Sequence, residues 1–381
     1  AAGGTIICTQ YLGQKNHEMA NKSARQALFI ITAISVFIVV LGLAFRAPLL
    51  SFIFGKVDAD VMENSMVYFF YTVLSYPFIA LYDAGASIFR AQENTRGPMV
   101  ISIISNVMNI VGNGILIWVF HMGVAGAAIS TLVSRIFCAV VVLYQLRKNR
   151  QPIVVRDYLK IRPDGKMIGR ILALGIPSGI ENSIFQLGKL AIQSTVSTLG
   201  TTAIAAQAMT NMLEMLNGTA VIGVGIGLMT VVGQSLGAGR KDEAVYYMKK
   251  LMIFSEVFLI ACCAVVYVLA RPITMIGGME AKSAEMCLDM MFWITIVKPI
   301  VWMFAFIPAY GMRAAGDVKF SMITSCITMW TFRFCLCVYL IRVCGMGPMA
   351  VWIGMFTDWT VRAIVFGLRF KSGKWMEHKV V

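Results

Sequence analysis

Charged side chains are scarce in this sequence. Asp, Glu, Lys and Arg make up only 14% of its 381 residues, whereas a soluble globular domain carries about 25%. Hydrophobic residues make up 58% of the chain, and its mean hydropathy is +0.75. These values exclude an ordinary soluble domain and a disordered chain, because neither combines so little charge with so many apolar side chains.

Metal-ligand patterns are missing as well. The three histidines are scattered, and the nine cysteines show no CxxC or zinc spacing. Most cysteines lie inside apolar runs, as Cys262 and Cys263 do, which is typical of small buried hydrophobic residues. We therefore expect no metal site and no cofactor. The lack of any acid or nucleophile cluster argues against an enzyme.

Long apolar runs are what the sequence has in abundance. A helix needs ~20 apolar residues to cross a hydrocarbon core. After a short run at 1–13, ten runs reach that length: about 26–54, 64–89, 99–120, 123–146, 167–199, 202–236, 244–270, 285–312, 320–341 and 348–368. The sequence therefore predicts an all-α integral membrane protein whose spans contact the lipid bilayer.

Lysine and arginine are distributed unevenly over the loops between these spans. Alternate loops on one side hold most of them, whereas the opposite loops hold only Arg46, Lys56, Arg271, Lys282 and Arg342. Because basic loops face the cytoplasm, this pattern predicts the orientation of every span. The net charge of +14 then results from the basic residues of the cytoplasmic loops. We expect the basic stretch 148–164 to be a cytoplasmic linker near lipid headgroups, and not a nucleic-acid site.

The two halves of the chain repeat each other. Gln10-Tyr-Leu-Gly13 matches Gln234-Ser-Leu-Gly237, and Pro48 matches Pro272 at the same offset. Equivalent loops lie on the same side, so we predict parallel repeats. The expected divisions are an N-lobe at 1–147, the linker at 148–164 and a C-lobe at 165–381. Applied to the start of the second repeat, the same offset predicts that one whole span and most of the next precede Ala1 in the complete protein.

Several short motifs follow one another along the chain. They are Asn106-Val-Met-Asn109, Gly123-Val-Ala-Gly-Ala-Ala128, Gly233-Gln-Ser-Leu-Gly-Ala-Gly239, Arg313-Ala-Ala-Gly-Asp317 and Asp358-Trp359 with Arg362. In order and spacing they resemble the motifs of the MATE (multidrug and toxic compound extrusion) transporters, including the repeated Gly-Gln-x-x-Gly-Ala-Gly signature. The resemblance covers the whole chain, from the end of that family's helix 2 to the end of its helix 12.

The resemblance implies two six-helix lobes around a central cavity, with the first lobe shortened here at its start. It implies a monomeric secondary antiporter of the bacterial inner membrane. Such a protein exports small amphipathic, often cationic, drugs or metabolites in exchange for Na+ or H+ by alternating access. A flippase for lipid-linked saccharides, from the same wider superfamily, is the alternative, and it would favour a cavity with several arginines.

One helix of the predicted C-lobe carries a polar stripe. Its polar residues recur at helical spacing over about 100° of the helix surface: Ser178, Asn182, Gln186, Lys189, Gln193 and Ser197. In hydrocarbon such a stripe must face protein or water. Helix–helix hydrogen bonding is one reading. The other is a substrate cavity lined by Asn182, Gln186, Lys189 and Gln193, with Gln207 and Asn211 from the next span.

Charges within spans are costly and are therefore candidates for function. We expect Glu181 and Glu214 to serve in ion coupling as a carboxylate pair sharing a cation. The alternative is that they form structural pairs with Lys189 or Arg333. Further structural ion pairs of the C-lobe are expected from four residues: Lys298, Arg333, Asp358 and Arg362.

The first lobe offers fewer titratable groups. Asp83 is its only acid within a span, and it is the third candidate for ion coupling. Many relatives in the resembled family carry Asn and then Asp at the positions of Asn109 and Asn113, but an amide at 113 cannot titrate. We therefore expect Asn109 and Asn113 to line the substrate cavity without carrying a proton.

Overall fold

The structure is a computed structural model that describes residues 2–54, 58–148, 152–156, 158, 161–378 and 380–381. These residues form helices and their connections, with no strand among them, as the all-α prediction requires. The chain divides into two compact units, Ala1–Gly175 and Ile176–Val381. The division falls inside a helix and not at residue 165, because the first turns of that helix pack with the first unit. Arg170, for example, donates a hydrogen bond to the hydroxyl of Tyr11.

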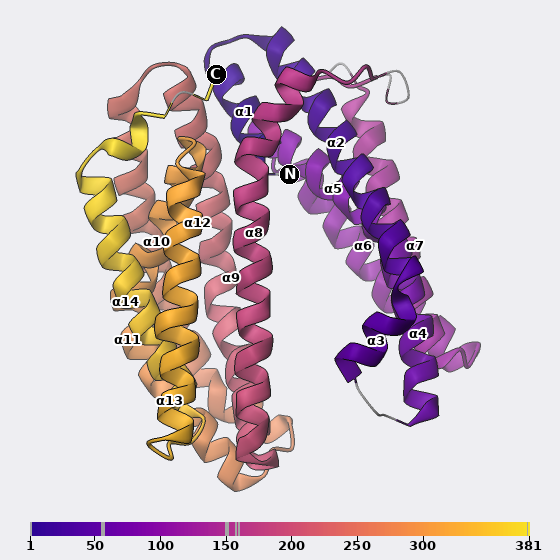
Figure 1. Ribbon diagram of the computed structural model, residues 1–381, viewed down its shortest axis with the longest axis vertical. Helices are drawn as coiled ribbons and strands as arrows, with labels where there is room; N and C mark the ends of the chain where they lie inside the picture. Colours follow the sequence, from indigo (N-terminus) through magenta and orange to yellow (C-terminus); the bar gives the residue numbers. More distant parts are fainter. Residues whose placement is uncertain (1, 55–57, 149–151, 157, 159–160, 379) are drawn as a thin grey trace. The chain divides into compact units, whose positions relative to one another are not determined.

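The first unit contains seven α-helices and the start of an eighth (Figure 1). They are α1 (Ala2–Gly13), α2 (His17–Ala44), α3 (Arg46–Phe54), α4 (Ala59–Leu74), α5 (Tyr76–Ala91), α6 (Arg96–Gly114), α7 (Gly123–Leu146) and α8 (Gly165–Val196). A π-helical turn, Ile115–Val119, extends α6. The predicted span 64–89 is broken at Ser75, because Pro77 has no backbone N–H with which to continue the helical hydrogen bonds. Within this unit α7 packs against α4, α5 and α6.

The second unit holds the rest of α8 and six further helices, coloured magenta to yellow in Figure 1. They are α9 (Thr201–Gly237), α10 (Lys241–Ile276), α11 (Ala281–Ala314), α12 (Val318–Thr328), α13 (Leu336–Arg342) and α14 (Met349–Lys371). A π-helical segment, Met329–Cys335, joins α12 to α13. The central element is α11, which packs against α9, α10 and α14.

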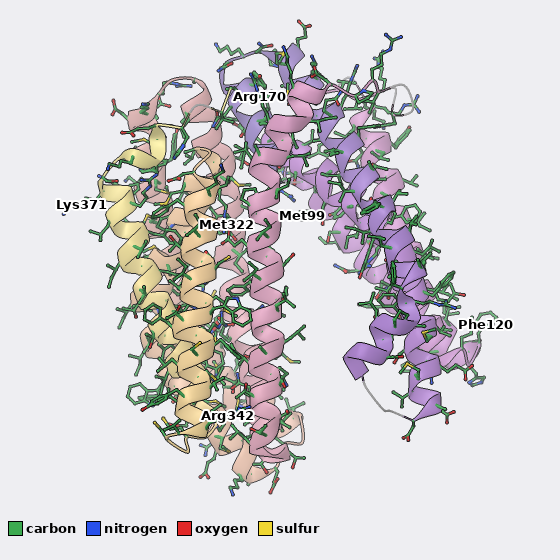
Figure 2. All side chains as sticks on the ribbon, in the orientation of Figure 1. Met99, Phe120, Arg170, Met322, Arg342 and Lys371 are labelled. Atoms are coloured by element: carbon green, nitrogen blue, oxygen red, sulfur yellow. The ribbon has the colours of Figure 1, made fainter. Side chains whose placement is uncertain are left out.

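The lengths and surfaces of the helices suit a bilayer. Within the ranges that the structure describes, nine helices are long and apolar enough to cross a membrane. The remaining predicted span, 167–199, corresponds to α8. This helix is long enough to cross a membrane, but its polar stripe lowers its hydropathy. Large apolar side chains such as Trp118 and Ile276 point outward, at 79% and 87% exposure. In the second unit Arg342 and Lys371 lie at opposite ends of the bundle, as the loop charges predict (Figure 2).

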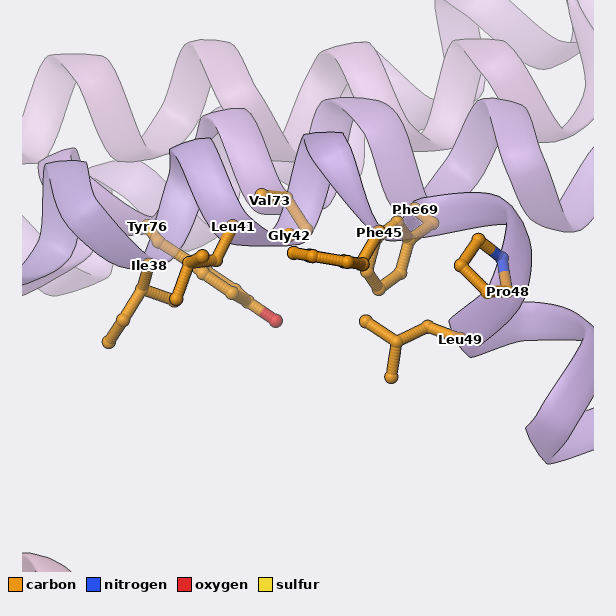
Figure 3. A pocket seen from close by; sticks show the side chains of 9 residues that line it. All are labelled: Ile38, Leu41, Gly42, Phe45, Pro48, Leu49, Phe69, Val73 and Tyr76. Atoms are coloured by element: carbon orange, nitrogen blue, oxygen red, sulfur yellow. The ribbon is translucent and has the colours of Figure 1, made fainter.

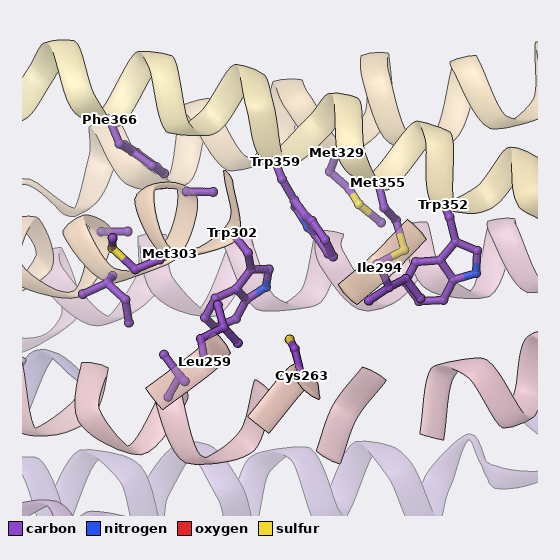
Figure 4. Close-up of a cluster of buried hydrophobic side chains, with 14 of the residues drawn as sticks. Leu259, Cys263, Ile294, Trp302, Met303, Met329, Trp352, Met355, Trp359 and Phe366 are labelled. Carbon is purple, nitrogen blue, oxygen red and sulfur yellow. The ribbon is translucent and has the colours of Figure 1, made fainter. Parts of the chain in front are cut away.

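The core of the second unit is built from aromatic and methionine side chains (Figure 4). Trp352 and Trp359 of α14 are buried at 0% and 1% exposure, and Met329 of the π-helical segment lies close to them. Trp302 of α11 belongs to the same cluster. Buried aromatic side chains contribute large apolar areas, and this cluster fixes α14 against α11.

The carboxyl end of the chain is tied to the loop between α11 and α12. Asp317 accepts a hydrogen bond from Arg369 Nε at 2.8 Å and lies 3.1 Å from His378 Nε2. Gly316 precedes it with a φ of +91°, which favours glycine. A side chain at Gly316 would also collide with Val380. The acid of the Arg313–Asp317 motif therefore has a structural role in this unit.

Candidate functional site

The second unit encloses a cavity of about 410 Å³. Its walls come from α8, α9, α11, α12, the π-helical segment and α14. Four basic and two acidic side chains line it, among aromatic and apolar ones: Lys189, Arg313, Arg333, Arg362, Glu181 and Glu214. Charges inside a membrane-spanning bundle are rare and mark functional sites. This cavity is therefore the candidate site.

The polar stripe of α8 supplies one wall of the cavity. Asn182, Gln186 and Lys189 line it, in agreement with the predicted positions. Ser178 lies buried and its carbonyl accepts a hydrogen bond from the Asn182 side chain. Gln193, which the sequence also predicted as a cavity residue, is exposed and does not line this cavity. The polar stripe is longer than the cavity, because α8 continues beyond the end of the cavity.

Glu181 is paired with a residue that the sequence placed in a loop. Arg313 Nη2 donates to Glu181 Oε1 at 2.7 Å, and the two side chains are 23% and 10% exposed. Arg313 belongs to the last turn of α11, where a basic side chain also faces the negative end of the helix dipole. The motif Arg313–Asp317 pointed to this residue in the sequence. Because the predicted span 285–312 ends before Arg313, its side chain was not considered for the cavity.

Glu214 has a basic partner of its own. Lys298 Nζ donates to Glu214 Oε1 at 2.5 Å and to the Glu214 backbone carbonyl at 3.1 Å. The Lys298 side chain is fully buried, and its ammonium lies 5.2 Å from the centre of the Trp302 ring. The two glutamates therefore line one cavity, each with its own basic partner. Their partners are Arg313 and Lys298, and not Lys189 or Arg333 as the alternative expectation had it.

A third ion pair lies in the wall at α14. Arg362 Nε donates to Asp358 Oδ1 at 2.7 Å, and its other two nitrogens donate to the Ser325 hydroxyl and carbonyl at 3.0 and 3.1 Å. Asp358 is fully buried. A guanidinium suits this geometry because its donors form a rigid fork. The structure thus places Asp358 and Arg362 in a buried pair on successive turns of one helix.

Arg333 stands apart from these tight pairs. Its Nη1 lies 4.0 Å from Asp358 Oδ2, and neither Asp358 Oδ2 nor the buried Arg333 Nε has a hydrogen-bond partner among the described residues. The π-helical segment that carries Arg333 packs closely on Gly354, where a Cβ would come within 2.8 Å of the Arg333 carbonyl. π-Helical turns of this kind are frequent at functional sites.

The family comparison decides the identity of this bundle. The profile of the MatE family matches residues 1–115 and 177–339 of the sequence. The chain belongs to the MatE family. The matched residues include two of the motifs of the second half, Gly233–Gly239 and Arg313–Asp317.

Two curated relatives match this MatE protein over nearly all of its length. It is 25% identical to a probable multidrug resistance protein NorM of Thermotoga maritima, covering 100% of this chain and 82% of that protein. It is 26% identical to the uncharacterized transporter YisQ of Bacillus subtilis, covering 99% and 83%. With the nine apolar helices found in its described residues, the MatE protein is a multi-pass protein of the bacterial inner membrane.

Solved structures show the same fold. A crystal structure of MATE in complex with MaL6 has a TM-score of 0.90 at 18% identity, over 99% of this chain and 84% of that one. The outward-facing conformation of a multidrug resistance MATE family transporter of the MOP superfamily gives the same values. The MatE protein therefore has the all-helical, two-lobe architecture that the sequence predicts.

Two predicted cavity residues of α9 have other surroundings. Gln207 is 2% exposed, accepts a hydrogen bond from Trp352 Nε1 at 3.1 Å and donates to the side chain of Asn211 at 3.2 Å. Neither Gln207 nor Asn211 lines this cavity. Gln207 instead satisfies the indole of a core tryptophan, which buried Trp requires.

The first-unit candidates of the MatE protein lie away from any charged pocket. Asn113 donates to Asn109 at 3.2 Å, and Asn109 donates to Thr131 at 3.2 Å, forming a chain of neutral groups. Asp83 is exposed on α5, and in the part of the chain that the structure describes it makes no ion pair. Neither Asn109 nor Asn113 lines a cavity described for this unit.

The first unit has a cavity of its own, of about 630 Å³, and this cavity is uncharged (Figure 3). It lies between α2, α3, α4 and the start of α5, and its lining includes Leu41, Phe69 and Tyr76. Its lining contains no charged side chain. Among the described residues, no group of three His, Cys, Asp or Glu side chains is arranged to hold a metal ion.

Proposed function

We propose that this chain is a secondary active antiporter that exports an amphipathic small molecule in exchange for H+ or Na+. The observation that carries the proposal is the cavity of the second unit, which combines charged groups with aromatic walls inside a membrane bundle. The relatives named multidrug resistance proteins support export of drugs or metabolites. Alternating access between the two lobes is the expected route.

The aromatic walls suit an apolar substrate body. Trp302 and Phe306 stack with their ring centres 4.9 Å apart, and both line the cavity beside Phe185. Ligand sites are mostly apolar with a few polar groups that fix orientation. A substrate with one flat apolar part and one polar end matches this lining.

The coupling ion would act at Glu181 and Glu214. Each carboxylate is held by one basic side chain, Arg313 or Lys298. Arrival of a proton or Na+ at either carboxylate would neutralise it and weaken that ion pair. An ion that favours one arrangement of the pairs shifts the population of states that have it. Exchange follows if the substrate favours the other arrangement.

Reconstituted transport tests the proposal. The purified chain is placed in proteoliposomes, and uptake of fluorescent amphipathic dyes of both charge signs is followed under an imposed pH or Na+ gradient. We expect transport that requires the protein, follows one of the two gradients and stops when an ionophore collapses it. Dye movement independent of both gradients, or none for any dye, would overturn the proposal.

The arginines of the cavity favour one second candidate, a flippase for lipid-linked saccharides. Arg313, Arg333 and Arg362 all line the cavity, and guanidinium groups bind phosphate with matched geometry. Liposomes containing a fluorescent prenyl-pyrophosphate lipid distinguish the two functions. Translocation of that lipid without gradient-driven dye transport would favour the flippase.

A further inference from the structure

The charge of the second-unit cavity is not balanced. Four basic and two acidic side chains line it. Behind the lining stand one more base, Lys298, and one more acid, Asp358. Each acid of this group forms one close ion pair: Glu181 with Arg313, Glu214 with Lys298, and Asp358 with Arg362. Of the two remaining bases, Arg333 has only a longer contact of 4.0 Å with Asp358 Oδ2, and Lys189 makes no ion pair among the described residues.

The two surplus bases lie against the same aromatic ring. Lys189 Nζ is 5.2 Å and Arg333 Cζ 5.1 Å from the centre of Phe185. Arg362 Cζ approaches the same ring at 5.6 Å. An aromatic face attracts each cation, but three like charges around one ring repel one another across a low-dielectric interior. A negative group between them would relieve that repulsion.

Two of the arginines that line this cavity have an unused hydrogen-bond donor. The Nε atoms of Arg333 and Arg313 are buried and have no acceptor among the described residues. Arg333 as a whole is only 6% exposed. Buried donors are normally satisfied, and one left without an acceptor needs an explanation. The described part of the chain supplies no acceptor for either of them.

We propose that this cavity binds an organic anion, a carboxylate, sulfonate or phosphate group on an apolar body. The acidic group lies between Lys189 and Arg333, and the apolar body lies against Trp302 and Phe306. The inference rests on the proposed function in one respect, which is that the bound anion is the exported molecule. An anionic substrate would take the place of the often cationic substrate that the family resemblance implies.

The same inventory disfavours a cationic substrate. The acids that line the cavity, Glu181 and Glu214, are already held by Arg313 and Lys298. A cation could engage one of them only by displacing that base. The displaced base would then be buried without a partner, which is costly. An anion displaces nothing.

Binding to the purified full chain in neutral detergent tests the inference without transport. The probes are two fluorescent molecules with one ring system, pyrenebutyrate as the anion and pyrenemethylammonium as the cation. We expect the anion to bind at least about tenfold more tightly. Equal binding of both probes, or tighter binding of the cation, would overturn the inference.

Substitutions locate the anion. Lys189→Gln should weaken pyrenebutyrate binding about tenfold, and Lys189→Arg should keep it. Lys282→Gln, which removes an exposed charge at the start of α11 away from the cavity, is the matched control. An unchanged Lys189→Gln affinity in protein that elutes as a single folded species would contradict the proposal. If Lys189→Gln fails to fold, Arg333→Gln provides the same comparison.

Competition identifies the source of the anion. Farnesyl pyrophosphate displacing pyrenebutyrate more strongly than benzoate or a naphthalene carboxylate, with farnesol inactive, would identify a lipid anion. The reverse order would identify a soluble aromatic acid. Anion binding without gradient-driven transport would remove the proposed antiport and leave this site in place. Gradient-driven transport of cations without anion binding would do the opposite.

Discussion

The carboxylate of Glu181 and the guanidinium of Arg313 lie 2.7 Å apart although 132 residues separate them in the chain. The contact joins the polar face of α8 to the last turn of α11. It holds one of the two candidate coupling groups in the wall of the second-unit cavity. A charge change at Glu181 would therefore act on two helices at once.

Replacing Glu181 with glutamine tests this coupling role. A glutamine side chain can neither titrate nor carry charge, so gradient-driven efflux should slow by about tenfold or more. Glu181→Asp, which still titrates, should keep part of the rate. The measurement is dye efflux from proteoliposomes, with Glu285→Gln, an exposed acid on α11, as the matched control. A wild-type rate in Glu181→Gln would remove Glu181 from the coupling mechanism.

The buried pair of Lys298 and Glu214 predicts a non-additive effect on stability. Lys298→Met leaves the Glu214 carboxylate without its partner and should cost about 3–5 kcal/mol of unfolding free energy. The double variant Lys298→Met with Glu214→Gln removes both charges and should recover most of the loss. Thermal unfolding in detergent measures it, with exposed Lys282→Met as control. A double variant no more stable than Lys298→Met would contradict this account.

Arg362 should not tolerate lysine. Its three nitrogens bind Asp358 and two oxygens of Ser325, and one ammonium cannot reproduce that fork. We expect Arg362→Lys to lower the unfolding free energy by about 2 kcal/mol. Arg342→Lys, at an exposed position at the end of α13, should change it by less than about 0.5 kcal/mol. Equal stability of the two variants would show that the fork contributes nothing.

Outside the spans, Asp164 predicts a pH dependence in the first unit. The Lys22 ammonium, 2.5 Å away, lowers the pKa of Asp164, and the backbone N–H of Met167 adds to the effect. Because the folded pKa lies below the unfolded value of about 4, this contribution to stability is present above pH 4. It is lost as the pH falls through the folded pKa.

Asp164→Asn isolates that contribution. The amide oxygen can still accept from the first backbone N–H groups of α8, as Asp164 does at 3.0 and 3.2 Å, but it carries no charge. We expect a small stability difference from wild type at pH 7, because exposed ion pairs are weak, and a smaller one at pH 3. Thermal unfolding in detergent at both pH values measures it. A difference that grows toward acid would have the wrong sign.

The apolar runs in the sequence were sufficient to predict the membrane helices, because crossing lipid sets both the length and the composition of a helix. The run 202–236 became α9 at Thr201–Gly237, and 348–368 became α14 at Met349–Lys371. The stripe on α8 likewise placed Asn182, Gln186 and Lys189 on one wall. Breaks at Ser75 and in the π-helical segments were missed, since a short distortion leaves hydropathy unchanged.

By itself the sequence determined that this is an all-α membrane protein with parallel repeats, and that charges gather in the second half. The number, spacing and sign of residues carry that information because lipid penalises each polar group separately. Only the tertiary structure decided which charges meet. Arg313 reaches Glu181 and Lys298 reaches Glu214. Arg333 lies only 4.0 Å from Asp358, and Lys189 makes no ion pair among the described residues. Pairing depends on which faces of α8, α9 and α11 pack together. Helical spacing shows which residues share a face, but not which other helix that face contacts.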